Sequence, residues 1–507
     1  MRHVGVAGAA VALVVGVMVA PPMGGGVALA APGGAVPCDF DGDGFADLAV
    51  SVAGEDLRGV RDAGAVQVLY GSATGVTARD QLWHQGRRGV KGALEKEDHF
   101  GAALVCGDFD ADGYADLAIG APDENVGSIR DAGIVQVLYG GPSGLTARDQ
   151  VWHQGKPGVP GTNEAGDRFG SRLAVGDFDG DGYADLAVAI PEEDVGSVND
   201  AGTVTVLRGS GSGLTATGSV KLRQGSNGMP SQPGRYEQFG TRLAAGDVNG
   251  DGRDDLVVVG EWDADFLASG YADLDEASSP VHVIFGSPVG LDPTGSQYFS
   301  PEALGFTRYT YVGQMTVADL NGDGLDDLAA WLYQASPSVA RIVVLHGQRT
   351  GLHIGPLPSA TTPGVDGLLS VPEGYGGNLV ATEFNGDGVT DLVVSNRTRE
   401  GRSFLVFLGT GTGLGTTFIE SELAAFGWAG YDGLMDALPL SGGTHEWLVL
   451  GAPGGEVRPG LVAGWVGVLH GTAAGTAGRV ALWHQDSPGI KGGAEVADWF
   501  GASVGTR

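Results

Sequence analysis

A nine-residue acidic segment recurs about every 70 residues along this 507-residue chain. It is Asp-Phe-Asp-Ala-Asp-Gly-Tyr-Ala-Asp at 108–116 and Asp-Phe-Asp-Gly-Asp-Gly-Tyr-Ala-Asp at 177–185, and an apolar run follows each copy. A seventh unit keeps the apolar run, at 447–453, without the acids before it. Seven units of this length indicate a repeat architecture. The related acidic segments open at Asp39, Asp247, Asp319 and Glu383, so successive starts are 69, 69, 70, 72 and 64 residues apart.

Each unit contains four short strand-like runs separated by glycine-rich turns. In the second unit these runs are 100–107, 117–121, 134–139 and 151–154, and no helical periodicity intervenes. Four-stranded units repeated seven times predict an all-β fold, a seven-bladed β-propeller of four-stranded blades. An open solenoid is the alternative for any repeat array.

The two ends of the chain favour a closed ring. The first unit begins at its acidic segment without a Phe-Gly strand before it, whereas Trp-Phe-Gly-Ala-Ser-Val stands at 499–504. The residues before that segment, 482–498, match 82–98 of the first unit. We therefore expect the C-terminal strand to join the first blade as its innermost strand, which leaves no terminal strand edge exposed.

The acidic segment has the ligand chemistry of calcium. Ca²⁺ takes about six to eight oxygen ligands. In the pattern D-x-[DN]-x-D-G-x-x-D, the side chains of positions 1, 3, 5 and 9 and the carbonyl of position 7 can surround one ion. We predict up to six bound Ca²⁺. The predicted ligands are Asp39, Asp41, Asp43, Phe45 and Asp47; Asp108, Asp110, Asp112, Tyr114 and Asp116; Asp177, Asp179, Asp181, Tyr183 and Asp185; Asp247, Asn249, Asp251, Arg253 and Asp255; Asp319, Asn321, Asp323, Leu325 and Asp327; and Glu383, Asn385, Asp387, Val389 and Asp391.

An EF-hand and an acidic turn without an ion are the two alternatives to this calcium loop. An EF-hand needs a Glu at position 12 and flanking helices. An acidic turn without an ion would leave up to four carboxylates in one short segment to repel one another. Position 12 argues against the EF-hand because it is apolar and lies in a strand-like run in every copy: Val50, Ile119, Val188, Val258, Ala330 and Val394.

Two further motifs of the repeat resemble a known family. Phe-Gly opens units at 100–101, 169–170 and 239–240 and recurs at 500–501, and Gly-Ala-Pro stands at 120–122 and 451–453. Together with the acidic loop, they resemble the FG-GAP repeat of integrin α-chain propellers and of secreted bacterial proteins, over residues 38–507. The resemblance implies metal loops on the face away from the ligand. The seventh unit departs from it by lacking the acidic loop, and six metal loops are more than such propellers usually carry.

Charge and the N-terminus indicate where the protein acts. The chain has 61 acidic against 29 basic residues, and a net charge of −32 argues against nucleic acid or an anionic membrane surface as partner. Residues 1–30 combine a basic start, an apolar run and an Ala-Leu-Ala cleavage site, which predicts a secretory signal. A linker at 31–37 and the propeller at 38–507 follow. We expect a secreted protein, extracellular or associated with the cell wall, without a membrane span; a membrane anchor at the N-terminus is the alternative.

The chain has only two cysteines, Cys38 and Cys106. They precede the first and second acidic loops by one and two residues, so neighbouring inner strands of a ring could bring them together. An exported chain permits a disulfide. We predict that the two are bridged, and two separate thiols are the alternative.

The sequence contains no H-E-x-x-H motif and no P-loop, and the G-x-S-x-G string at 501–505 lies in the predicted closing strand rather than at the strand-to-helix turn of a nucleophile elbow. We therefore expect no enzyme but a monomeric adhesion or ligand-binding module for an unidentified surface protein or glycan. The alternatives are a carbohydrate-binding propeller and a calcium-dependent polysaccharide hydrolase or lyase. The Trp-His pairs at 83–84, 152–153 and 483–484 recur with the repeat, which favours packing over catalysis or sugar stacking. The longest connections, such as 86–99 and 155–168, should form the binding face, opposite the acidic loops.

Overall fold

The computed structural model describes residues 38–72, 75–260, 280–306, 310–334, 339–354, 368–370, 375–396, 403–422, 436–441, 446–452, 456–458 and 461–504. The predicted signal segment and linker, 1–37, lie outside this part of the chain. The described residues form strands and turns only, and they include no helix that could cross a membrane.

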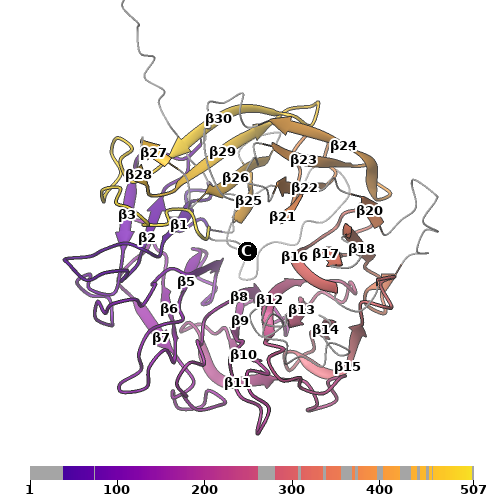
Figure 1. The fold of residues 1–507 in the computed structure, drawn as a ribbon, viewed down its shortest axis with the longest axis horizontal. Coiled ribbons are helices and arrows are strands. Elements are labelled where there is room, and N and C mark those ends of the chain that lie inside the picture. Colours follow the sequence, from indigo (N-terminus) through magenta and orange to yellow (C-terminus); the bar gives the residue numbers. More distant parts are fainter. Residues whose placement is uncertain are drawn as a thin grey trace, which may run out of the picture.

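Seven antiparallel sheets follow one another along the chain and surround a central axis (Figure 1). Blade 1 has β1 (Leu48–Val52), β2 (Ala65–Leu69) and β3 (Asp80–Trp83); blade 2 has β4 (Ala103–Gly107), β5 (Asp116–Ala121), β6 (Ile134–Leu138) and β7 (Asp149–Trp152); blade 3 has β8 (Leu173–Gly176), β9 (Asp185–Ile190), β10 (Thr203–Arg208) and β11 (Thr215–Leu222); blade 4 has β12 (Phe239–Gly246), β13 (Asp255–Gly260), β14 (Val281–Phe285) and β15 (Asp292–Phe299).

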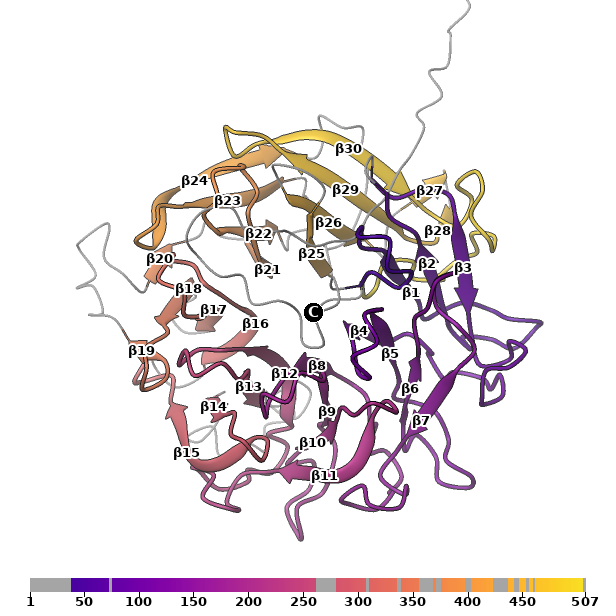
Figure 2. The same cartoon turned by 180° about the vertical axis from the view of Figure 1, so that it is seen from behind.

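The last three blades are more irregular. Blade 5 has β16 (Thr310–Ala318), β17 (Asp327–Gln334), β18 (Val339–His346) and β19 (His353–Ile354), with β20 (Leu368–Ser370) also pairing with β18; blade 6 has β21 (Tyr375–Thr382), β22 (Asp391–Asn396), β23 (Ser403–Gly409) and β24 (Leu414–Glu422); blade 7 has β25 (Asp436–Ser441), β26 (Glu446–Ala452), β29 (Trp465–Gly471) and β30 (Ala477–Trp483), with the hairpin β27 (Glu456–Arg458) and β28 (Leu461–Val462) between β26 and β29. The predicted all-β, seven-bladed propeller is thus confirmed (Figures 1 and 2).

The first strand of a blade is shorter than the sequence predicted. β4 begins at Ala103 rather than at residue 100. His99 and Gly101 have positive φ angles of 50° and 101°, which a pleated strand does not accommodate. In blades 2 and 3 the Phe-Gly motif therefore forms a turn at the entrance to the blade, whereas in blade 4 the first strand, β12, begins at Phe239 and includes the motif.

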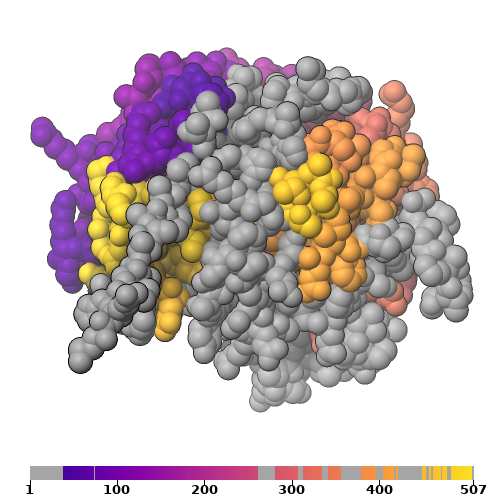
Figure 3. All heavy atoms as spheres, turned by 90° about the horizontal axis from the view of Figure 1, so that it is seen from above, coloured from indigo at the N-terminus to yellow at the C-terminus, as the bar shows by residue number. Residues whose placement is uncertain are grey.

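The C-terminal residues close the ring, as predicted. Val504 forms an antiparallel bridge with Val50 of β1. Ser51 N donates to Ser503 O at 2.8 Å, and Gly501 N donates to Ser51 O at 2.9 Å. These residues therefore supply the innermost position of blade 1, and C-terminal atoms lie against N-terminal ones in Figure 3.

A disulfide joins the first two blades. Cys38 precedes the first acidic loop, Cys106 lies in β4, and their Cα atoms are 5.2 Å apart. This confirms the predicted pairing.

Apolar layers between neighbouring blades form the core. Val105 and Val137 of blade 2 pack in one buried cluster with Leu186 of blade 3. The Phe of the Phe-Gly motif is fully buried, and a Cβ on Gly133, whose φ is 75°, would lie 2.4 Å from Phe169 N. Only glycine permits this approach. The Phe-Gly motif therefore packs between neighbouring blades and sets the distance between them.

Candidate functional site

The six acidic loops share one conformation, with the loop of blades 2 to 6 joining the first strand to the second. In blade 2, Asp108 accepts hydrogen bonds from Asp112 N at 3.1 Å and Gly113 N at 3.0 Å, and Asp112 Oδ1 accepts one from Tyr114 N at 3.1 Å. The position 1 and position 5 side chains thus fold the loop around its glycine. The contact between positions 5 and 7 recurs in Asp43–Phe45 at 2.9 Å, Asp181–Tyr183 at 3.0 Å, Asp251–Arg253 at 3.1 Å, Asp323–Leu325 at 3.0 Å and Asp387–Val389 at 2.9 Å.

The Asp at position 9 has a structural role that the sequence did not predict. Asp116 is buried, and its two oxygens accept from Phe109 N at 3.0 Å and Gly140 N at 2.9 Å. It thereby ties the loop to the connection between the third and fourth strands. The equivalent bonds to that connection are Asp47 to Gly71 N, Asp185 to Gly209 N, Asp255 to Gly286 N, Asp327 to Gly347 N and Asp391 to Gly409 N, at 2.7–2.8 Å.

Carboxylates converge in the first three loops. Three acids in each can place one oxygen apiece within 4.8 Å of the others. Asp110 is only 8% exposed, and its Oδ1 has no hydrogen-bond donor among the described residues. An oxygen-only donor set with a buried, unpartnered oxygen fits a hard cation such as Ca²⁺. The converging acids are Asp39, Asp41 and Asp43; Asp108, Asp110 and Asp116; and Asp177, Asp179 and Asp181.

Asparagine replaces aspartate at position 3 in the other three loops and changes their contacts. Asn249 Nδ2 donates to Asp255 Oδ2 at 3.1 Å, and Asn385 Nδ2 donates to Asp387 Oδ2 at 3.0 Å. By donating these hydrogen bonds, the asparagine amides partly compensate the negative charge of the remaining carboxylates in each loop. The fourth to sixth loops therefore carry less uncompensated negative charge than the first three.

An arginine contacts position 3 in each of the first three loops. Arg79, Arg148 and Arg208 form ion pairs with Asp41, Asp110 and Asp179, respectively. The Arg79 and Arg148 guanidinium groups also lie over the Tyr70 and Tyr139 rings, at 4.0 and 3.9 Å from the centroids. These arginines are not among the residues predicted from the sequence, although Thr-Ala-Arg-Asp recurs at 77–80 and 146–149.

Burial sets the protonation of the loops in the absence of a cation. It raises the pKa of Asp39 and of Asp108 to about 6, an effect that the backbone N–H bonds of each loop oppose and neighbouring carboxylates reinforce. It raises the pKa of Asp116 well above the ordinary value. A bound cation must therefore displace protons as it binds.

The first four loops also contact the next blade through backbone hydrogen bonds. Ala184 N donates to Asp108 O at 3.0 Å, and Ser210 N donates to Phe109 O at 3.1 Å, so the second loop is bonded to two connections of blade 3. The same pair of bonds links Asp39 and Phe40 to blade 2. An ion that orders one loop would therefore also stabilise the boundary between two blades.

On the other face, the Trp-His pairs are packing elements. Trp83 and Trp483 are buried and Trp152 is half-buried, and the Trp83 indole donates to Gln81 Oε1 at 2.8 Å. Burial lowers the pKa of the partner histidines, including His84. The structure therefore supports a packing role for the Trp-His pairs rather than a role in catalysis or sugar stacking.

A row of side chains follows the inner rim of this face, and the sequence analysis did not identify it as a site. The residue before each Phe-Gly has a positive φ, and in three blades its side chain joins the row. Trp499, 44% exposed, stacks on His99 with the ring centroids 5.9 Å apart. His99 Nδ1 lies 2.7 Å from Asp123 Oδ2, and Arg168 bridges Asp123 at 3.0 Å and Glu192 at 2.8 Å. We call these five residues the rim row.

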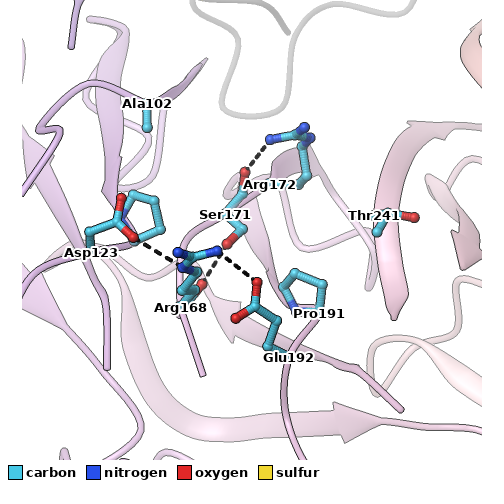
Figure 4. A pocket seen from close by; sticks show the side chains of 9 residues that line it. Ala102, Asp123, Arg168, Ser171, Arg172, Pro191, Glu192 and Thr241 are labelled. Carbon is cyan, nitrogen blue, oxygen red and sulfur yellow. Dashed lines mark hydrogen bonds and ion pairs between the residues drawn. The ribbon is translucent and has the colours of Figure 1, made fainter. Parts of the chain in front are cut away.

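The rim row borders a cavity of about 280 Å³ between blades 2, 3 and 4. Arg168 lies between the two carboxylates in it, and Arg172 points along its edge (Figure 4). Ser171 and Thr241 add hydroxyl groups to the lining. The cavity thus offers closely spaced hydrogen-bond donors and acceptors whose charges largely balance.

The seven-bladed ring with its acidic metal-type loops on one face defines a β-propeller of the kind found in integrin α chains. The FG-GAP repeat model matches residues 28–69, 100–138, 169–207 and 239–261, so the first part of the chain carries FG-GAP repeats. Integrin alpha pat-2 of Caenorhabditis briggsae is 32% identical over 236 residues, which are 44% of this chain and 17% of the relative.

Other relatives differ in their named activities. Phosphatidylinositol-glycan-specific phospholipase D of Mus musculus is 35% identical over 158 residues, covering 31% of this chain and 18% of the relative. The aligned segments of both relatives span less than a fifth of their length. Among solved structures, rhamnogalacturonan lyase YesW is similar over 82% of this chain and 65% of its own, with 13% identity and a TM-score of 0.37. This last likeness concerns the fold alone.

Proposed function

We propose that the protein is a secreted, calcium-binding propeller that acts as a non-catalytic module and binds its ligand on the face opposite the acidic loops. The observation that carries this proposal is the rim row with its adjoining cavity. It combines an exposed aromatic ring with fixed charged groups on a rigid scaffold, and binding residues concentrate in such loops. The partner would be a surface protein or a glycan.

The cavity contacts favour binding over catalysis. Asp123 and Glu192 are both engaged by Arg168, so neither is held as a free general acid or base. The Ser171 hydroxyl donates to Arg168 O at 2.7 Å, so it is not directed at His99 as a nucleophile would be. A calcium-dependent hydrolase or lyase remains the alternative for a site elsewhere on the ring.

Calcium is assigned a structural role in this proposal. The loops are bonded to neighbouring blades, and their acids converge on an oxygen-only site. A cation there would offset the repulsion among acids and hold adjacent blades together. We expect no direct contact between calcium and ligand, because the rim row lies on the other face.

A glycan is the ligand that one observation favours. The Trp499 ring, stacked on His99 and 44% exposed, offers a flat apolar surface beside a cavity of mixed donors and acceptors. A hydroxyl-rich, uncharged ligand can stack on such a ring and exchange hydrogen bonds with the Arg168 ion pairs without breaking them. A strongly charged peptide would have to disrupt those pairs.

A binding screen against glycans and surface proteins, with calcium and with EGTA, tests this function. We expect W499A and R168A to weaken binding at least tenfold, about 1.4 kcal/mol, while the unfolding midpoint stays close to that of the wild type. V289A, which removes an exposed apolar residue from the acidic-loop side, serves as control. If only metal-loop variants such as D112A lose binding, the ligand site is on the calcium face and the proposal is wrong.

A further inference from the structure

Two carboxyl groups from different blade connections are buried together between blades 1 and 2. Asp98, in the connection from β3 to β4, is fully buried, and Glu124, in the connection from β5 to β6, is 8% exposed. Gln85 Nε2 donates to Glu124 Oε2 at 2.8 Å, and Glu95 N donates to Asp98 Oδ2 at 2.9 Å. The Asp98 and Glu124 carboxyl groups also lie close enough to influence each other electrostatically.

Two adjacent carboxyl groups can bond to each other only if one of them carries a proton, because an ionised carboxylate only accepts. Asp98 Oδ1 is buried and has no hydrogen-bond partner among the described residues. The charged groups facing the pair are Glu95, which adds negative charge, and His99, whose Nδ1 is already 2.7 Å from Asp123. Nothing in this set offers a full compensating positive charge to Glu124.

The electrostatics agree with the geometry. Burial raises the pKa of Glu124 to about 8 and that of Asp98 to about 6, and for Glu124 the Asp98 charge is the next largest cause. The Gln85 amide opposes the shift of Glu124. A buried pair of this kind retains one proton through neutral pH.

The next boundary has the same pair of carboxyl groups with a cation beside it. Between blades 2 and 3, Gln154 donates to Glu193 Oε2 at 2.5 Å, and burial raises the pKa of the neighbouring Asp167 to about 7. Lys221 of β11 forms an ion pair with Glu193 there. In the repeat, Lys221 corresponds to Val151 of β7, so the second blade lacks this ammonium group.

We infer that Asp98 and Glu124 are a proton-binding clasp that holds blades 1 and 2 together and releases when the shared proton is lost. Without the proton, two negative charges face each other in a buried site, and the boundary loosens. The clasp adjoins the rim row, since Asp98 precedes His99 and Glu124 follows Asp123. Ligand affinity would therefore also respond to pH, a consequence that rests on the proposed function.

The sign of the pH effect follows from the raised pKa. Folding takes up a proton where the folded pKa exceeds the unfolded one, so the stabilisation is complete below the ordinary Glu pKa of about 4.5 and is lost as pH rises through about 8. One linked proton lowers the folding equilibrium constant up to about tenfold per pH unit within that window.

The test compares urea unfolding of the full chain from about pH 5 to pH 9 in saturating calcium, without any ligand, so that it can fail or succeed independently of the binding proposal. In E124Q the amide can donate to Asp98 permanently, and V151K supplies the ammonium group that Lys221 supplies in blade 3. Both variants should show a flatter pH profile than the wild type. K221V should show a steeper one.

Infrared spectroscopy gives a readout that does not depend on unfolding. We expect the protonated-carboxyl band at about pH 6 to be weaker in E124Q than in the wild type, and the difference to vanish by about pH 9. Superimposable pH profiles of wild type, E124Q and K221V, or an unchanged band in E124Q, would overturn the clasp.

Discussion

The two faces of the ring both bury carboxylates, but they compensate the buried charge by different means. On the acidic-loop face, Asp116 accepts two backbone N–H bonds, and the acids around it converge on a cation site. On the other face, Glu124 has one amide donor and, in the proposed clasp, shares a proton with Asp98. With a cation bound, the first arrangement tolerates ionised carboxylates, whereas the second depends on keeping one of them neutral.

This difference implies that calcium and protons act on separate parts of the same ring. Calcium binding needs deprotonated acids, so rising pH favours the acidic-loop face when calcium is present. Rising pH instead weakens the Asp98–Glu124 clasp. A protein exported into surroundings of varying acidity would therefore have two opposed controls on blade packing.

The largest effect we expect is that of calcium on the whole ring. For loops with dissociation constants of about 10⁻⁴ to 10⁻³ M, about 5 mM Ca²⁺ adds about 1–2 kcal/mol to the free energy of unfolding for each filled loop. Up to six loops contribute. Urea unfolding in calcium and in excess EGTA measures the sum, and coincident curves would show that the loops bind no ion that matters for stability.

A pair of substitutions in one loop separates an acid that also holds the fold, Asp116, from an exposed predicted ligand, Asp112. D116A leaves Phe109 N and Gly140 N without their buried acceptor, which should cost about 2–5 kcal/mol even in EGTA. D112A removes an exposed side chain and should change stability in EGTA by less than about 1 kcal/mol, yet abolish calcium binding at that loop. Equal losses for both variants in EGTA would contradict the division of roles.

The sequence predicted the blades and the acidic loops because both depend on local spacing. The D-x-D-x-D-G pattern encodes its own turn, and the match between 482–498 and 82–98 revealed the ring closure. The clasp could not be predicted in this way. Asp98 and Glu124 are two of 61 acidic residues, and only the packing of neighbouring blades buries them against each other.

The same limit explains the arginines and the rim row. Arg148 reaches Asp110 because the connection between the third and fourth strands folds back over the loop, a contact 38 residues apart in sequence. Trp499 reads as part of the closing strand, but its positive φ of 56° turns it outward. The spacing of the repeat predicts where strands and loops lie. It does not predict the direction in which a turn points a side chain, so these contacts could not be predicted from it.

The boundary between blades 7 and 1 offers a weaker version of the clasp. Gln485 donates to Glu55, and burial, with Asp498 nearby, raises the Glu55 pKa to about 7. In wild type this stabilisation is lost as pH rises from about 4.5 through about 7, so E55Q should be more stable than wild type at about pH 8, by at most about 3 kcal/mol. E302Q removes one negative charge at an exposed site and is the control for net charge. An equal gain in the free energy of unfolding in E302Q would show that burial of Glu55 is not the cause.

The smallest effect concerns the arginines over the first three loops. Arg148 pairs with Asp110 and lies over Tyr139 with 46% of its side chain exposed, so R148A should cost less than about 1 kcal/mol in stability. A calcium ion at this loop must share Asp110 with the guanidinium and approach its positive charge. R148A should therefore bind calcium a few-fold more tightly at one loop, as measured by calorimetric titration, whereas R88A, the same charge change on the opposite face, should not. Weaker binding by R148A would mean instead that Arg148 holds Asp110 in position for the ion. The arginines would then stabilise the conformation of the acidic loops as much as calcium does.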